Sequence, residues 1–184
     1  FIEANKFVFT FCYDYDANGS GELAFKLATV SGGTITINDT EVIGSTYSNR
    51  IICPAIAVDP NNLGKVVLVY VNESNNYTYA RIVQVTGTTL TMYTTTTIDT
   101  QSSYQATKSF VMFDQSSSGN RIIILIDDFD VYLTAHTVTG TTIGIPSDRT
   151  TWTFSSCNYI GGFAPYPDDD SKFLIYYYDH IGVQ

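Results

Sequence analysis

An acidic stretch near the start of the sequence has the residue types and spacing of a cation-binding loop. Its side chains present oxygen atoms at the first, third and fifth positions, Gly19 stands at the sixth, and a carboxylate closes it at the ninth. Calcium prefers about six to eight hard oxygen ligands, and a glycine allows the sharp turn that gathers them. The sequence therefore predicts a Ca²⁺ site whose ligands are Asp14, Asp16, Asn18, Ser20 and Glu22.

This loop resembles the calcium hairpin loops in the propeller of integrin alpha chains, with Glu22 where those loops end in aspartate. The resemblance implies a calcium-binding hairpin and covers this loop alone. The aligned hairpins at 72–77 and 127–132 lack the pattern, so the site would not recur in each repeat. A solvated acidic turn is the alternative interpretation, because Asp, Asn and Gly are common turn residues.

Other polar groups give weaker signals. Asp168–Asp170 could bind a cation or a basic partner, but these residues are more typical of a turn between two strands. His136 and His180 stand in sequence without any known catalytic motif, and no phosphate-binding glycine loop is present. We therefore predict no catalytic residues and no enzymatic activity. A pair of carboxylates brought together by folding, as in glycoside hydrolases, is the alternative that sequence alone leaves open.

Tyrosines are a further group that could bind a ligand. Tyr77 and Tyr79 alternate along one predicted strand, whereas the run Tyr176–Tyr178 must present rings to both faces of its strand. Such rings can stack on sugars or contact proteins, but between packed sheets they are usually core residues, which is the interpretation we favour.

The composition is typical of strands and turns. Hydrophobic residues make up 44% of the 184 residues and charged residues only 15%, and the sequence holds 14 Tyr and 11 Phe. No long window has a helical apolar rhythm, so we expect an all-β protein with little or no helix. A net charge of −9 argues against nucleic acid as a partner, and no apolar run is long enough to predict a membrane span.

An internal repeat is the main signal in the sequence. One turn motif occurs three times, with its aligned valines Val30, Val85 and Val138 separated by 55 and then 53 residues. A second motif recurs in step, and its basic residues are 56 and 51 residues apart. These basic residues are Lys65, Arg121 and Lys172. Two markers with one shared period of about 54 residues indicate a tandem repeat architecture.

Each repeat is predicted to form four antiparallel strands. In the complete copy we expect strands near 53–59, 65–72, 77–85 and 88–93, separated by turns such as Thr86-Gly87-Thr88. Four strands in about 50 residues are the unit of a propeller blade, so the sequence predicts a β-propeller-like fold. A β-solenoid or a linear stack of small sheets is the alternative.

The chain is predicted to be one repeat domain over 1–184, with about three and a half repeats. Their approximate limits are 1–49 (partial), 50–104, 105–158 and 159–184 (partial). This is fewer than the roughly four to eight blades that usually close a ring, and an open half-ring would expose apolar blade faces. We therefore expect a segment of a longer polypeptide, with assembly of several copies into a homo-oligomer as the alternative.

Two residue patterns bear on the surroundings of the protein. Cys12, Cys53 and Cys157 have neither zinc-site nor disulfide spacing, so we predict buried free thiols. Four glycosylation sequons, at Asn18, Asn38, Asn72 and Asn76, would be exposed in a secreted protein, although chance alone accounts for about two of them.

The order of motifs resembles tandem repeats in predicted structural proteins of marine phages and algal viruses. It comprises an Asp-Pro-Asn turn (59–61), a strand Lys-Val-Val-Leu-Val-Tyr (65–70), a polar Asn/Ser/Tyr hairpin and a Val-Thr-Gly-Thr-Thr-Leu turn (85–90). The resemblance spans about 6–178, but the third copy carries acids at its hairpin. It implies a non-catalytic structural or adhesive part of a virion fibre or appendage, located extracellularly or on a virion surface.

The partners implied are other structural proteins or cell-surface glycans. A lectin-like glycan-binding propeller is the first alternative, and a propeller-type glycoside hydrolase is the second. Fold alone does not choose among these three functions.

Overall fold

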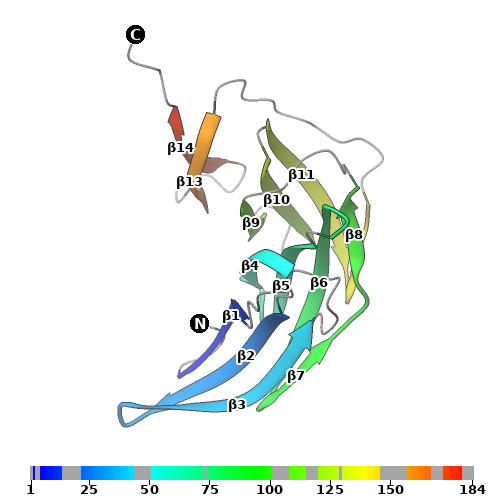
Figure 1. Cartoon of the computed structure of the whole chain (residues 1–184). Helices are drawn as coiled ribbons and strands as arrows, with labels where there is room; N and C mark the ends of the chain where they lie inside the picture. The colour runs from blue at the N-terminus through cyan, green and yellow to red at the C-terminus, as the bar shows by residue number, and fades with distance from the viewer. Residues whose placement is uncertain are drawn as a thin grey trace.

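The protein is built from antiparallel β-sheets that follow one another in the order of the sequence (Figure 1). The computed structural model describes residues 2, 5–13, 22–43, 51–72, 74–100, 108–114, 120–128, 130–145, 157–166 and 172–179. These residues contain strands and turns and no helix, as the composition predicted. They accordingly include no helix that could cross a membrane. The sheets curve together without closing a ring.

The first two sheets come from the first half of the chain. Sheet 1 has three strands: β1 (Lys6–Tyr13), β2 (Glu22–Ser31) and β3 (Thr34–Ile43). Sheet 2 has β4 (Ile51–Asp59), β5 (Asn62–Asn72), β6 (Tyr77–Thr86) and β7 (Thr89–Met92), and β8 (Thr96–Asp99) also pairs with β6. The four strands predicted for the complete repeat are therefore confirmed, whereas β8 was not predicted.

The other two sheets come from the second half. Sheet 3 has four strands: β9 (Lys108–Phe113), β10 (Arg121–Asp128), β11 (Asp130–Thr139) and β12 (Thr142–Ile143). Sheet 4 has two: β13 (Cys157–Pro165) and β14 (Phe173–Asp179). Strand order follows the sequence in sheets 1 and 3 and from β4 to β7 of sheet 2, so these strands form simple meanders of hairpins.

The three recurring glycine turns occupy equivalent hairpins. In each, two residues separate a closing pair: Ser31 with Thr34, Thr86 with Thr89, and Thr139 with Thr142. The first turn residue is a glycine with positive φ in every case, namely 57° at Gly32, 61° at Gly87 and 58° at Gly140. Glycine adopts this conformation without a steric penalty, and such two-residue turns match the twist of the paired strands. The sequence repeat is therefore also a repeat of backbone structure.

The recurring basic residue also has an equivalent role in two sheets. Lys65 forms an ion pair with Asp59 at 2.6 Å, and Arg121 forms one with Asp114. Both aspartates are buried where the first strand of the sheet ends, and both basic residues stand near the start of the second. The pair therefore fixes the turn between these two strands. In sheet 4, Tyr166 takes the place of the aspartate, because its backbone N–H donates to the Lys172 carbonyl oxygen as that of Asp114 donates to Arg121.

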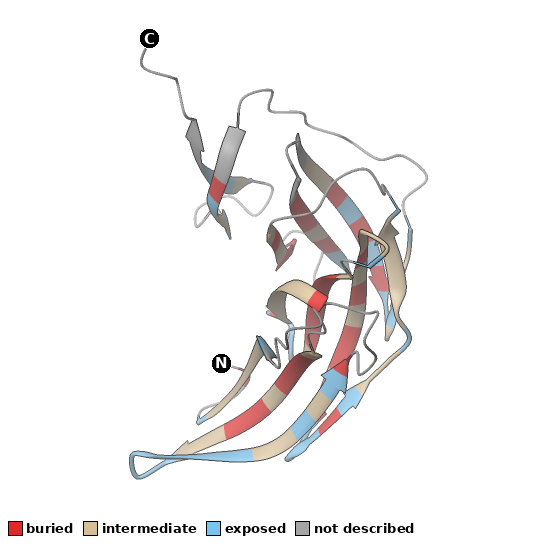
Figure 2. Cartoon of the chain, in the orientation of Figure 1, coloured by how far each residue is buried: buried red, intermediate tan, exposed pale blue. Residues whose placement is uncertain are grey.

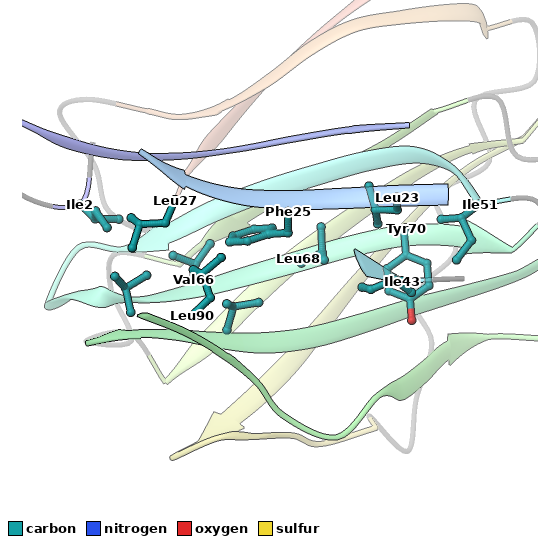
Figure 3. Close-up of a cluster of buried hydrophobic side chains, with 12 residues drawn as sticks. Ile2, Leu23, Phe25, Leu27, Ile43, Ile51, Val66, Leu68, Tyr70 and Leu90 are labelled. Carbon is teal, nitrogen blue, oxygen red and sulfur yellow. The ribbon is translucent and has the colours of Figure 1, made fainter. Parts of the chain in front are cut away.

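The sheets stack face to face, and β5 shows this most clearly. All residues from 66 to 71 are buried, which the figure draws as red along the strand (Figure 2). The even-numbered ones lie in a core with Leu23, Phe25 and Leu27 of β2, and Figure 3 shows Phe25 between the two strands. The odd-numbered ones from 67 to 71 lie in a second core with Ile122 and Ile124 of β10. Because side chains alternate along a strand, β5 contributes to both cores.

A third core joins sheets 3 and 4. Leu125 of β10 and Ile160 of β13 are fully buried there, and Phe110, Phe163 and Ile175 pack around them. The first strands of successive sheets also lie side by side, with β9 against both β4 and β13. Two polar contacts support this arrangement.

The first polar contact joins β9 to β4, where the Ser109 hydroxyl donates to the Cys53 carbonyl oxygen. The second joins β9 to β13, where Lys108 Nζ donates to the Ile160 carbonyl oxygen at 3.2 Å. Sheet 3 is therefore held to sheets 2 and 4 by apolar side chains and by hydrogen bonds to backbone carbonyl oxygens.

Gly64 at the start of β5 is a position where the backbones approach closely. A Cβ there would lie 2.9 Å from the Val85 carbonyl oxygen and 2.8 Å from the Gln84 side-chain amide. We expect Gly64→Ala to lower the free energy of unfolding by about 2 kcal/mol, because the clash is partly with backbone. Gly162→Ala is the matched control, because nothing lies within 4 Å of its Cβ position. Urea unfolding should leave that control within about 0.5 kcal/mol of the parent protein, and equal losses for the two variants would contradict the assignment.

Candidate functional site

The predicted calcium loop joins β1 to β2. The hairpin is closed by the pairing of Tyr13 with Glu22, and Glu22 is half-buried at the first position of β2. Residues 14–21 lie outside the described residues, and with them the other four predicted ligands. Those ligands are Asp14, Asp16, Asn18 and Ser20. Within the described part, no three His, Cys, Asp or Glu side chains gather as a metal site. The calcium site stays a prediction from the sequence.

Of the other candidate site residues, the structure describes some and leaves others outside the described residues. Asp168–Asp170 and His180 lie outside the described residues. Asn38 stands opposite a register shift between β2 and β3, and its side-chain nitrogen is buried. That nitrogen is the atom that would carry a glycan. The residue as a whole is half-buried, so the expectation of an exposed sequon was wrong for the atom that would carry the glycan.

The cysteines differ from the prediction of buried thiols in one respect. Cys12 is exposed near the end of β1, which is an edge strand of sheet 1, so the prediction was wrong for this residue. Cys53 is half-buried in β4 at a register shift, with a φ of 53°. The side chain of Cys157 lies outside the described residues.

His136 is buried in β11 and makes two hydrogen bonds. Its Nδ1 lies 3.1 Å from the Gly144 carbonyl oxygen, and its Nε2 lies 3.0 Å from the Thr134 hydroxyl. A carbonyl only accepts, so Nδ1 donates to Gly144, and the neutral ring accepts from Thr134 through Nε2. Burial lowers the pKa of His136 below its ordinary 6.5, while the bond to Gly144 opposes the shift. Both ring nitrogens of this buried imidazole are therefore hydrogen-bonded within the chain.

The lowered pKa of His136 makes stability depend on pH. Below pH 6.5 the unfolded chain takes up a proton at this residue and the folded chain does not, so stability should fall as pH decreases. Between about pH 7.5 and about pH 5.5 we expect His136 to contribute a loss of up to about 1.4 kcal/mol. His136→Gln should remove that part of the pH dependence. Chemical unfolding of both proteins at the two pH values measures it, and identical pH dependence would contradict the assignment.

Tyrosines at the end of the β5–β6 hairpin form the main polar and aromatic cluster in the described chain. The Tyr70 and Tyr79 rings stack with centroids 5.6 Å apart, and Tyr77 lies 6.3 Å from Tyr79. Asn75 Nδ2 donates to the Tyr79 hydroxyl at 2.9 Å. Arg81, two residues further along β6, donates to the Thr95 hydroxyl. We call Tyr70, Tyr77, Tyr79, Asn75 and Arg81 the tyrosine cluster.

The tyrosine cluster is part core and part surface. Tyr70 is buried, which raises the pKa of its phenol, and Tyr79 packs against the first core. Tyr77 and Asn75 are half-buried beyond them. The core interpretation is therefore correct for Tyr79. The sequence did not indicate a role for Tyr70, although the pairing of the two predicted strands places it opposite Tyr79.

Comparison with protein-family models, curated proteins and solved structures finds no match to this chain.

Proposed function

We propose that this chain is a non-catalytic structural and adhesive module of an extracellular or virion appendage. Its sheets are proposed to be blades of a β-propeller, and its turns and rims are proposed to contact other structural proteins or surface glycans. The observation that carries the proposal is the burial of β5 on both faces between two neighbouring sheets. A strand used in this way stiffens a scaffold and leaves its own faces unavailable to a ligand.

The arrangement of the strands supports the propeller part of the proposal. In a propeller, the first strand of each blade lies nearest the central axis, and blades pack face to face around it. Here β4, β9 and β13 are the first strands of sheets 2, 3 and 4, and β9 lies beside the other two. A linear stack of the same sheets is the competing arrangement.

Adhesion through many weak contacts gives the proposal a direct test. Beads that carry many copies of the chain should bind a glycan- or protein-coated surface, while the soluble chain in solution should bind weakly, because avidity supplies the affinity. Tight, saturable binding of one glycan by the soluble chain would favour the lectin-like alternative. Turnover of aryl glycosides by the purified chain would favour the hydrolase and overturn the proposal.

The lectin-like alternative has one supporting observation, which is the tyrosine cluster. Stacked rings next to an amide and a guanidinium are groups that sugars bind, and Tyr77 and Asn75 lie at its outer side. If the cluster binds glycans, Tyr77→Ala should abolish binding on a glycan array. Tyr93→Ala is a suitable control, because Tyr93 is half-buried and belongs to the second core instead.

The calcium prediction is testable in the same protein. If residues 14–22 hold Ca²⁺, millimolar calcium should raise the unfolding temperature of the parent chain, because a ligand that binds only the folded state stabilises it. Asp14→Ala combined with Asp16→Ala should abolish that rise, since it removes two of the five predicted ligands. Asp99→Ala is a control carboxylate on β8. An equal rise in all three proteins would show that calcium binds elsewhere.

A further inference from the structure

The exposed large apolar side chains of the described chain gather at the two ends of the stack of sheets. Four of the eight such residues lie on sheet 1 and two lie on sheet 4. Those on sheet 1 are Phe11, Ile35, Ile37 and Val42, and those on sheet 4 are Leu174 and Tyr176. The remaining two are Leu63, near the start of β5, and Ile145, which follows β12. Contiguous apolar patches of this kind mark interaction surfaces, whereas scattered single residues do not.

On sheet 1 these residues share the face that points away from sheet 2. The strand register sets Phe11, Ala24 and Val42 in one row across the sheet. A second row, with Phe7, Ala28 and Ile37, lies four pairs further along on the same face. The rings of β1 form a ladder along it, with centroids 5.8 and 5.9 Å apart between successive phenylalanines. We call this the leading face.

On sheet 4 the exposed apolar residues share the face that points away from sheet 3. Leu174 pairs with Ala164 and Tyr176 with Gly162, while the alternate residues Phe163 and Ile175 lie in the third core. Tyr176 is 72% exposed, and its ring lies so close to Gly161 that a Cβ there would come within 2.5 Å of it. The ring therefore lies close to Gly161 and remains exposed. We call this the trailing face.

The three interfaces inside the chain explain why these two faces are complementary. In each one, the face of a sheet that points toward the C-terminal end of the stack packs on the opposite face of the next sheet. Aliphatic and aromatic side chains fill all three interfaces. By register, the leading face of sheet 1 and the trailing face of sheet 4 correspond to the two sides of such an interface. Exposed apolar side chains on both faces match the apolar side chains of the internal interfaces, and the leading face also carries Lys26, whose amine lies 5.6 Å from the centroid of the Phe11 ring.

We infer that the trailing face of one copy binds the leading face of a second copy of this chain. This inference rests on the proposed function, because it names the partner of the structural role. The contact is head to tail, so each copy uses two different surfaces. Such contacts build a ring if the rotation closes and an open filament if it does not.

Two single-face variants and their mixture test the inference. Ile37→Lys places a charge on the leading face, and Leu174→Lys places one on the trailing face, at residues that are 44% and 52% exposed. In sedimentation velocity, the parent chain should gain mass with concentration, to dimers and larger species. Each variant alone should stay monomeric. An equimolar mixture should form a species of twice the mass of one chain and nothing larger, because each copy retains one competent face.

Controls separate this contact from misfolding and from other partners. Ile145→Lys carries the same change at a residue that is 68% exposed and lies on neither face, so it should assemble like the parent. Monomeric parent chain at every concentration would overturn the inference, and so would a mixture that stays monomeric. Assembly that survives Leu174→Lys but not Ile37→Lys would indicate pairing of two leading faces, which also overturns it. None of these results depends on glycan or surface binding, so the proposed function can fail separately.

Discussion

Leu68→Ala is expected to lower the free energy of unfolding by about 3 kcal/mol, the typical cost of emptying a well-packed apolar site. Leu68 is fully buried in the first core, between sheets 1 and 2, where Phe25 lies across from it (Figure 3). A rigid stack cannot close the cavity without shifting a whole sheet. The loss should therefore include a cavity cost in addition to the lost burial of the side chain.

The matched control for Leu68 lies on the same strand. Leu63 is an exposed leucine near the start of β5, so Leu63→Ala should change the free energy of unfolding by less than about 0.5 kcal/mol. Urea unfolding of the three proteins measures both values. Similar small losses for the two variants would mean that sheet 1 does not cover β5.

Lys65→Met is expected to cost about 3 kcal/mol, because it leaves the buried carboxylate of Asp59 without its ion-pair partner. The side chains of Lys65 and Asp59 are only 12% and 2% exposed, so water does little to solvate the remaining charge. Methionine keeps most of the apolar stem of lysine. The loss should therefore come from the charge and from its contact with the Phe113 ring.

A double-mutant cycle isolates the charge. Asp59→Asn keeps an oxygen to accept the Asn61 backbone N–H, which Asp59 Oδ1 binds at 2.9 Å. Adding it to Lys65→Met removes the uncompensated carboxylate, so the double variant should be at least about 1 kcal/mol more stable than the sum of the single losses predicts. Strict additivity, measured by urea unfolding of all four proteins, would contradict a direct interaction between the two side chains.

Much of the fold was predictable from the sequence because the same strand and turn motifs occur in several repeats. The glycine turns need positive φ, and the same motif at three positions predicted three hairpins that the structure confirms. The unbroken apolar run at 66–71 indicates a strand buried on both faces. Which sheet covers which face depends on packing between repeats, and no local pattern encodes it.

Two features were not predictable for physical reasons. The strand β8 forms because residues 93–95 interrupt pairing along β6, and Arg81 spans the interruption by reaching Thr95 and Met92. No turn motif marks that interruption. Cys12 has apolar neighbours in sequence, yet it is exposed because β1 is an edge strand.

The candidate site was less predictable than the fold. Residues of the tyrosine cluster come from two strands and a hairpin, so their proximity follows from register rather than from spacing in the sequence. The acidic loop, by contrast, was predicted from the spacing of its residues in the sequence alone. Its assignment to calcium rests on ligand type, and Glu22 is the one ligand position that the structure describes.

The central claim is that every repeat forms one sheet and that successive sheets stack face to face. Nuclear Overhauser contacts from the methyl groups of β5 test it most directly. Methyls of Val66 and Leu68 should contact the Phe25 ring of sheet 1, and methyls of Val67 and Val69 should contact Ile122 and Ile124 of sheet 3. Contacts from both sets of methyls to a single sheet, or to neither, would contradict the stack.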